Sequence, residues 1–188
     1  MTRLIAGTAG GRRIEVPPGR GTRPTSDRAR EGIFSTVGSL AGVPERVADL
    51  YAGSGAIGLE SLSRGSGHAL LVESDAKALR TIRANVAALG LPGAVVRPEK
   101  VERLVARPCE GEPYDFVFAD PPYAVSDEVV GRVLVQLLEN GWLAEGALVA
   151  VERETRGNDL QWPPGYEEAR ARRYGEATVW YGHANRAE

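Results

Sequence analysis

From residue 46 onward, short runs of apolar residues alternate with longer segments in which apolar residues recur every three or four positions. The apolar runs, which we interpret as strands, cover residues 46–50, 69–72, 94–97, 115–119 and 147–151. The segments between them that we expect to be helical are 56–64, 75–89, 100–106 and 126–140. Strands that are apolar on both faces need cover on both faces, and helices that connect parallel strands provide it. The sequence therefore predicts an α/β protein built on a mostly parallel sheet.

The C-terminal part does not continue this alternation. Residues 168–174 and 177–181 are strand candidates on either side of Gly175, a pattern typical of an antiparallel hairpin. Together with the five apolar runs, this hairpin predicts a seven-stranded sheet that ends in antiparallel strands.

The first 24 residues differ from the rest and predict a small unit of their own. Arg3–Ala6 and Arg12–Val16 are strand candidates on either side of a glycine-rich turn, which indicates a β-hairpin. Residues 17–24 are rich in proline and glycine and are interpreted as a linker. A helix is expected to follow, with Thr25 or Ser26 as its N-cap. We therefore divide the chain into a basic β-hairpin with its linker, residues 1–24, and a main domain, residues 25–188.

Positive charge is concentrated near the N-terminus, although the whole chain has a formal net charge of −2. Residues 1–31 contain seven arginines and three acidic residues, a net charge of +4. A basic segment on an acidic body indicates a polyanionic partner, and the alternative is a hairpin whose charges are merely solvated. The residues that we expect to contact such a partner are Arg3, Arg12, Arg13, Arg20, Arg23, Thr25 and Arg28.

Cysteine and histidine are scarce, since the chain contains only Cys109, His68 and His183. One cysteine cannot form an intramolecular disulfide, and two isolated histidines do not indicate a zinc site. No apolar run approaches the roughly 20 residues of a membrane helix, and the N-terminus lacks the apolar stretch of a signal peptide. We therefore expect a cytoplasmic protein with neither a metal nor a membrane partner.

The turn after the first apolar run is rich in glycine. Gly53, Gly55 and Gly58 satisfy the G-x-G-x-x-G pattern of dinucleotide binding, so a nicotinamide-dependent oxidoreductase has to be considered. Asp49, however, stands four residues before the first glycine, where added negative charge would repel a pyrophosphate and attract a cation. S-adenosylmethionine carries an ammonium and a sulfonium and has no pyrophosphate. The D-x-x-x-G-x-G spacing therefore favours this methyl donor.

Acidic residues also follow the next two strands. Glu73 closes the second strand, where its carboxylate can accept both ribose hydroxyls of either cofactor class. Glu99 follows the third strand, where it could accept from an adenine amine beside an apolar wall at Val101; a role at the start of the next helix is the alternative. The residues that we expect to contact the donor are Asp49, Tyr51, Ala52, Gly53, Ser54, Gly55, Glu73, Ser74, Glu99, Val101 and Asp120.

Asp120, Pro121, Pro122 and Tyr123 follow the fourth strand. Two prolines cannot continue a strand, so the chain leaves the sheet at its carboxyl edge, where open α/β sheets bind ligands. The exocyclic amine of a base is a poor nucleophile because its lone pair is delocalised into the ring. Acceptors on Asp120 and on the Pro121 carbonyl would hold its N–H groups so that the lone pair points at the methyl group. Tyr123 would stack on the base; a proline turn with a capping aspartate is the alternative. Cys109 lies in a polar loop away from this turn and is not placed to attack a pyrimidine carbon.

The order and spacing of these motifs match a known family. The residues that carry the match lie at 5–13, 22–28, 49–55, 63–65, 72–73 and 120–123. Over nearly its whole length the chain resembles the RsmD-type 16S rRNA guanine-N2 methyltransferases. The Asp-Pro-Pro-Tyr turn is shared with adenine-specific DNA methylases, whereas the Thr-Arg-Pro-Thr-Ser-Asp segment at 22–27 is more selective. Ala29 departs from the family pattern, which usually has a larger aliphatic residue there.

The resemblance implies a Rossmann-like class I methyltransferase domain over residues 25–188 with an N-terminal β-hairpin extension. It also implies S-adenosylmethionine as donor and guanine 966 of 16S rRNA as target, in an assembling small ribosomal subunit, and we expect a monomer. Thr25 and Arg28 would then lie over the donor crevice. Because the hairpin is too small to hold much core of its own, we expect its deletion to leave donor binding largely intact.

Three other functions remain open. A DNA adenine methylase normally carries a target-recognition region for which 188 residues leave little room. A nicotinamide oxidoreductase is disfavoured by Asp49 and by the Asp-Pro-Pro-Tyr turn. A non-catalytic RNA-binding protein would not need intact donor and amine motifs.

Overall fold

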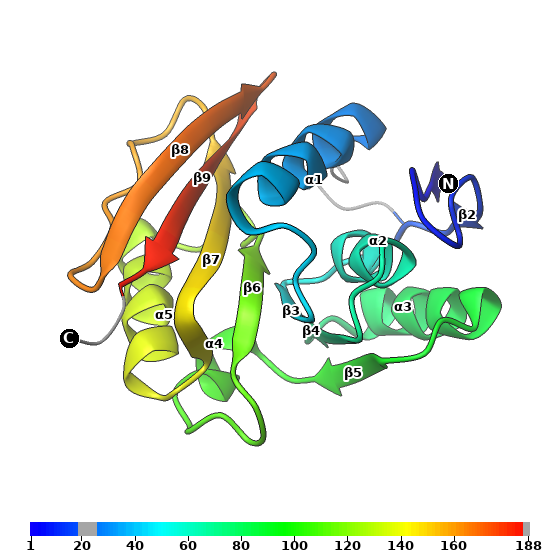
Figure 1. Cartoon of the computed structure of the whole chain (residues 1–188), viewed down its shortest axis with the longest axis horizontal. Coiled ribbons are helices and arrows are strands. Elements are labelled where there is room, and N and C mark those ends of the chain that lie inside the picture. The colour runs from blue at the N-terminus through cyan, green and yellow to red at the C-terminus, as the bar shows by residue number, and fades with distance from the viewer. Residues whose placement is uncertain (19–25, 186–188) are drawn as a thin grey trace.

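The computed structural model describes residues 1–18 and 26–185. Its main sheet has seven strands in the order β5-β4-β3-β6-β7-β9-β8. The parallel strands are β3 (Arg46–Leu50), β4 (His68–Glu73), β5 (Ala94–Pro98), β6 (Tyr114–Ala119) and β7 (Leu143–Glu154). The last two strands, β8 (Tyr166–Tyr174) and β9 (Ala177–Ala184), form an antiparallel hairpin that pairs with β7 through β9. Figure 1 shows this hairpin at one edge of the sheet. The predicted fold class is confirmed.

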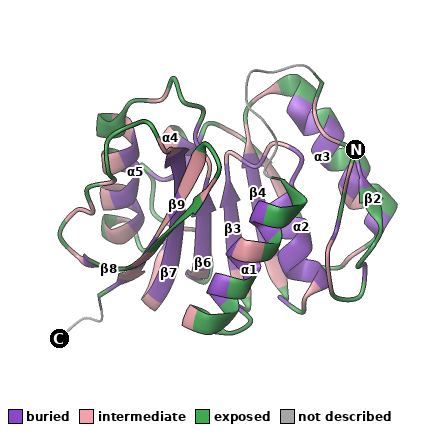
Figure 2. Ribbon diagram, turned by 90° about the horizontal axis from the view of Figure 1, so that it is seen from above, coloured by how far each residue is buried: buried purple, intermediate pink, exposed green. Residues whose placement is uncertain are grey.

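Helices cover both faces of the sheet. The helices are α1 (Asp27–Ala41), α2 (Ala56–Ser63), α3 (Ala76–Leu89), α4 (Val101–Leu104) and α5 (Asp127–Glu139). Apolar residues of α1, α2 and α3 pack on one face, and those of α4 and α5 pack on the other. In Figure 2 the buried central strands run between these helices. None of the helices within residues 1–18 and 26–185 is long and apolar enough to cross a membrane.

Strand register decides which side chains share a face at the carboxyl end of the parallel strands. Asp49 of β3 pairs with Phe118 of β6, and Phe118 pairs with Ala150 of β7. Phe118 and Ala150 pack with α1, so Asp49 also lies on the α1 face. Side chains alternate between faces along a strand, which places Asp120 on this same face, two residues after Phe118.

The N-terminal hairpin is shorter than predicted and shares the core of the main domain. Its strands, β1 (Thr2–Arg3) and β2 (Arg13–Ile14), have only two residues each. Leu4, Ala9 and Ile14 are buried in one cluster with residues of α2 and α3, and Figure 1 shows the hairpin beside these helices. The predicted linker lies mostly outside the described residues, and the predicted N-cap of α1 is confirmed for Ser26, whose Oγ accepts from the Ala29 amide.

The backbone of the hairpin lies directly against the backbone at the C-terminal end of α2. Gly7 has φ +81°, and a Cβ on it would lie 1.8 Å from the Ser63 carbonyl oxygen, so only glycine fits there. Next to it, the Thr8 amide donates to the Ser63 carbonyl and the Ala9 amide to the Ser63 hydroxyl. Backbone hydrogen bonds therefore fix the hairpin to the end of α2.

Candidate active site

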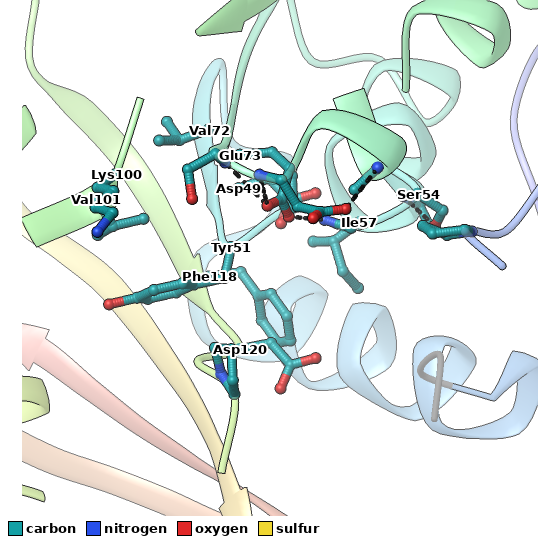
Figure 3. A pocket seen from close by; sticks show the side chains of 18 of the residues that line it. Asp49, Tyr51, Ser54, Ile57, Val72, Glu73, Lys100, Val101, Phe118 and Asp120 are labelled. Atoms are coloured by element: carbon teal, nitrogen blue, oxygen red, sulfur yellow. Dashed lines mark hydrogen bonds between the residues drawn. The ribbon is translucent and has the colours of Figure 1, made fainter. Parts of the chain in front are cut away.

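A cavity of about 360 Å³ lies at the carboxyl ends of β3, β4, β5 and β6. Every residue that the sequence predicts as a donor contact lines it, except Gly55, which is the left-handed N-cap of α2. Figure 3 shows Asp120 on the opposite side of the cavity from Glu73. The sequence-predicted residues at the ends of these strands therefore come together in one place.

Asp49 lies at the base of this cavity and is only 2% exposed. Its Oδ2 accepts a hydrogen bond of 3.0 Å from the Gly58 amide in the first turn of α2. Burial raises the pKa of Asp49 to about 8; the Gly58 hydrogen bond opposes the increase and the nearby Glu73 carboxylate adds to it. A buried carboxyl group in this state would be stabilised as an anion by a cationic ligand, so the cavity fits the positively charged end of S-adenosylmethionine.

Glu73 closes the cavity wall at the end of β4. Its Oε1 accepts from the Gly53 amide at 3.0 Å, and its Oε2 accepts from the Ser74 and Asp75 amides at 2.9 Å. These bonds hold the carboxylate still and leave it on the cavity surface. Gly53 has φ +58° and no heavy atom within 4 Å of the position a Cβ would take, so a ligand can approach its backbone closely.

Tyr51 also lines the cavity and is the only residue other than glycine with a positive φ, +61°, among those the structure describes. This left-handed conformation is costly for an aromatic residue and is typical of functional turns. Burial raises the pKa of the Tyr51 hydroxyl, and the nearby Glu102 carboxylate adds to the increase.

The third strand end forms the wall predicted for adenine. Val101 is buried at the start of α4 and lines the cavity, as does Glu99. The Glu99 carboxylate, however, is held by both terminal nitrogens of Arg107, with 2.9 Å between Nη2 and Oε2. This pairing lowers the pKa of Glu99. The predicted role of Glu99 as an acceptor therefore has to compete with an ion pair.

The Asp-Pro-Pro-Tyr turn leaves the sheet after β6. Asp120 and Pro122 line the cavity, and Pro121 is buried. Burial raises the pKa of Asp120 well above its usual range, and the carboxyl groups of Glu152 and Asp49 add to the increase. Tyr123 is 43% exposed and does not line the cavity. Burial raises the pKa of its hydroxyl, and the carboxyl groups of Glu152 and Asp120 add to the increase.

The comparisons with known proteins agree with this geometry. Ribosomal RNA small subunit methyltransferase D of Escherichia coli is 38% identical over 152 residues, which cover 81% of this chain and 74% of that protein. The protein of the same name from Haemophilus influenzae is 32% identical over 154 residues, 81% of this chain and 78% of its own length. The profile of the family described as "Conserved hypothetical protein 95" matches residues 2–183. The chain belongs to this family, the RsmD-type methyltransferases.

The solved structure of yhhF from Escherichia coli has the same fold. It superposes on this RsmD-type chain with a TM-score of 0.83, at 32% sequence identity and with 98% of both chains covered. The Rossmann-like architecture of class I methyltransferases, which the family resemblance implied, is confirmed.

The arginines of the N-terminal region have more than one role in this RsmD-type structure. Arg3, Arg13 and Arg28 are exposed. Arg12 donates to the Ala88 carbonyl at 2.8 Å, so it binds the C-terminal end of α3. The predicted contacts Arg20, Arg23 and Thr25 lie outside the described residues.

Sequence reasoning missed a buried network that closes the cavity from the N-terminal side. Thr2, Pro17 and Arg30 line the cavity. Arg30 is completely buried; it donates to the Arg3 carbonyl and forms an ion pair of 3.6 Å with Glu60 of α2. The signal for Arg30 was present, because it falls beside Ala29 and Ile33 on the apolar side of α1. Because Arg30 is positively charged, it was counted with the basic N-terminal residues and not with the buried ones.

Proposed function

We propose that this chain transfers a methyl group from S-adenosylmethionine to the exocyclic N2 amine of a guanine in 16S rRNA, guanine 966 by family resemblance. The transfer would take place in the cytoplasm, on an assembling small ribosomal subunit. The observation that carries the proposal is the position of Asp120. Its carboxyl group lies on the cavity wall opposite Glu73, at a rigid proline turn that also carries the exposed Tyr123.

Two acids would bind the donor. Asp49 is buried without a cationic partner of its own among the interactions that shift its pKa, and it would pair with the positive charge of the donor. Glu73 is held by three backbone amides and would accept the ribose hydroxyls with its remaining lone pairs. Bound there, S-adenosylmethionine supplies an electrophilic methyl group.

The proline turn would orient the target amine. Asp120 Oδ and the Pro121 carbonyl would accept its two N–H groups, which fixes the direction of the nitrogen lone pair. Because Pro121 is buried and both prolines restrict the backbone, these acceptors need little reorganisation when the base arrives. Tyr123 would stack on the extruded base.

Exposed arginines lie on two separate segments of the chain. Arg3, Arg13 and Arg28 belong to the N-terminal hairpin and the first turn of α1. Arg172 and Arg173 are exposed near the end of β8. This end reaches the carboxyl edge of the sheet, since the Thr155 amide, just after β7, donates to the Glu176 carbonyl at 2.8 Å. Guanidinium groups on both segments support a phosphate-backbone partner.

Replacing Asp120 tests the proposal. Asp120→Ala should raise the activation free energy of single-turnover methyl transfer by about 2.7–4 kcal/mol, as for other preorganised groups. It should leave the affinity for the methyl donor close to that of the wild type. The assay offers labelled donor with small subunits, with free 16S rRNA and with duplex DNA. Mass mapping then locates the modified nucleoside.

Three results would overturn the proposal, two in the assay and one in ligand binding. One is methylation of adenine in DNA with none in rRNA, which would favour the DNA methylase alternative. The other is a near-wild-type single-turnover rate for Asp120→Ala, which would remove Asp120 from the reaction. Tight binding of NADH without binding of the methyl donor would reassign the cavity altogether.

A further inference from the structure

Glu152 is a buried acid that none of the motifs includes. It lies on β7 and is 6% exposed. Ala119 of β6 pairs with Val151 of β7, so the residues that follow them, Asp120 and Glu152, are neighbours on adjacent parallel strands. Glu152 lies two residues after Ala150 and therefore on the α1 face, the same face as Asp120.

Side chains that are in register on one face of adjacent strands lie side by side, and after burial Glu152 is the largest cause of the raised pKa of Asp120. The other charged or titratable groups that act on this pair are Asp49 on β3, Tyr123 in the loop after β6 and Arg153 on β7. Arg153 points elsewhere, because its Nη2 donates to the Val125 carbonyl at 2.9 Å and to Asp127 at 3.0 Å. Two carboxylates in contact cannot both be ionised at low cost without a cation between them.

We propose that Glu152 is a positioning residue that holds Asp120 through a hydrogen bond whose proton the two carboxyl groups share. One oxygen of Asp120 is then fixed by Glu152, and the other remains free to accept from the target amine. Loss of the shared proton at alkaline pH would leave two repelling carboxylates and displace Asp120. This inference rests on the proposed function, since it concerns the orientation of the amine.

Three variants separate this role from a structural one. Glu152→Leu removes the hydrogen-bond partner of Asp120 and should lower kcat by about 100-fold. The affinity for S-adenosylmethionine and the KM for RNA should change by less than about threefold. Glu152→Gln keeps an N–H donor at every pH. It should retain most of the wild-type kcat at pH 7. Its rate should not decrease at alkaline pH as we expect the rate of the wild type to do. Glu154→Gln, two residues further along the same strand face, is the matched control and should keep the wild-type profile.

Carboxyl-carbon NMR titration gives a readout that does not depend on activity. In the wild-type chain the Asp120 carboxyl group should titrate well above its usual range, and in Glu152→Gln it should titrate at lower pH because a carboxylate neighbour is gone. An Asp120 titration that is the same in the wild type and in Glu152→Gln would overturn the inference, as would a wild-type kcat for Glu152→Leu. An unchanged alkaline limb in Glu152→Gln would also overturn it. If the wild type methylates no rRNA at all, the proposed function fails, and the NMR titration still decides whether the pair shares a proton.

Discussion

Asp49 ties the stability of the chain to pH. Its pKa of about 8 lies above the ordinary value of 3.8, so between these pH values the folded chain keeps a proton that the unfolded chain has released. The contribution of Asp49 to the free energy of unfolding therefore falls as pH rises through this window and levels off above pH 8. Asp49→Asn has no proton to lose, and its amide oxygen can still accept from Gly58.

We expect Asp49→Asn to gain stability relative to the wild type as the pH is raised from 5 to 8, by up to about 4 kcal/mol. The same substitution should weaken donor binding by about tenfold or more, because the ligand loses its counter-charge. Urea unfolding at both pH values measures the first effect, and calorimetry measures the second. A stability difference that is the same at pH 5 and pH 8 would show that Asp49 is ionised in the folded chain.

Residues of the site could be predicted where one short stretch of sequence contains both the structural signal and the chemical group. Asp49 and Asp120 each stand at the end of an apolar run, next to glycine or proline residues that force the chain to turn. Glu152 and Glu60 carry no such signal. Their roles depend on strand register and on contacts between distant segments, which the local pattern does not contain.

At the scale of elements, the distance between α2 and the sheet depends on Gly58. A Cβ on Gly58 would lie 2.2 Å from Leu71 Cδ2, and Leu71 is fully buried on β4. Gly58→Ala should therefore destabilise the chain by about 1–3 kcal/mol, although alanine is the better helix former. Gly38→Ala is the matched control, because a Cβ at that exposed position of α1 meets nothing within 4 Å; it should stabilise by up to about 1 kcal/mol. Thermal unfolding of both variants checks the contrast, and equal shifts would contradict it.

The segments that form strands and helices could be predicted, because a strand that is buried on both faces is a continuous apolar run. The residues at which the strands begin and end were harder to predict. The strand predicted at 147–151 is β7, which extends over Leu143–Glu154. Its outer residues include Glu145, Glu152 and Glu154, whose charge hides them from a search for apolar runs. The hairpin strands were overestimated for the opposite reason, since Leu4 and Ile14 are apolar because they pack on α2 and α3 rather than because they extend a strand.

At the scale of the whole molecule, the N-terminal segment forms part of the wall of the cavity at the carboxyl ends of the strands. We expected its deletion to leave donor binding largely intact, but Thr2 and Pro17 line the cavity and Leu4 and Ile14 lie in the core. A truncated chain would lose both a cavity wall and buried apolar surface. The composition of residues 1–24 indicated a separate unit because packing against a distant helix leaves no mark in the local sequence.

Glu60 fastens this segment to the rest of the molecule. It is completely buried on α2, accepts from the Ile5 amide at 2.7 Å and the Ala6 amide at 3.1 Å, and pairs with Arg30. Glu60→Ala leaves two amides without their acceptor and removes one of the two carboxylates that pair with the buried Arg30, which keeps Asp27 at 3.0 Å. We therefore expect a loss of about 3–5 kcal/mol in the free energy of unfolding. Because Thr2 and Arg30 line the cavity, donor affinity should fall as well.

Urea unfolding and donor titration of Glu60→Ala measure these two effects, with Glu31→Ala on the exposed side of α1 as the control. The control should stay within about 0.5 kcal/mol of the wild type. If Glu60→Ala loses stability and keeps full donor affinity, the N-terminal segment supports the fold without shaping the cavity. If Glu60→Ala loses neither stability nor donor affinity, water replaces the Glu60 carboxylate at no cost in free energy. The N-terminal segment is then an independent arm, as its composition indicated.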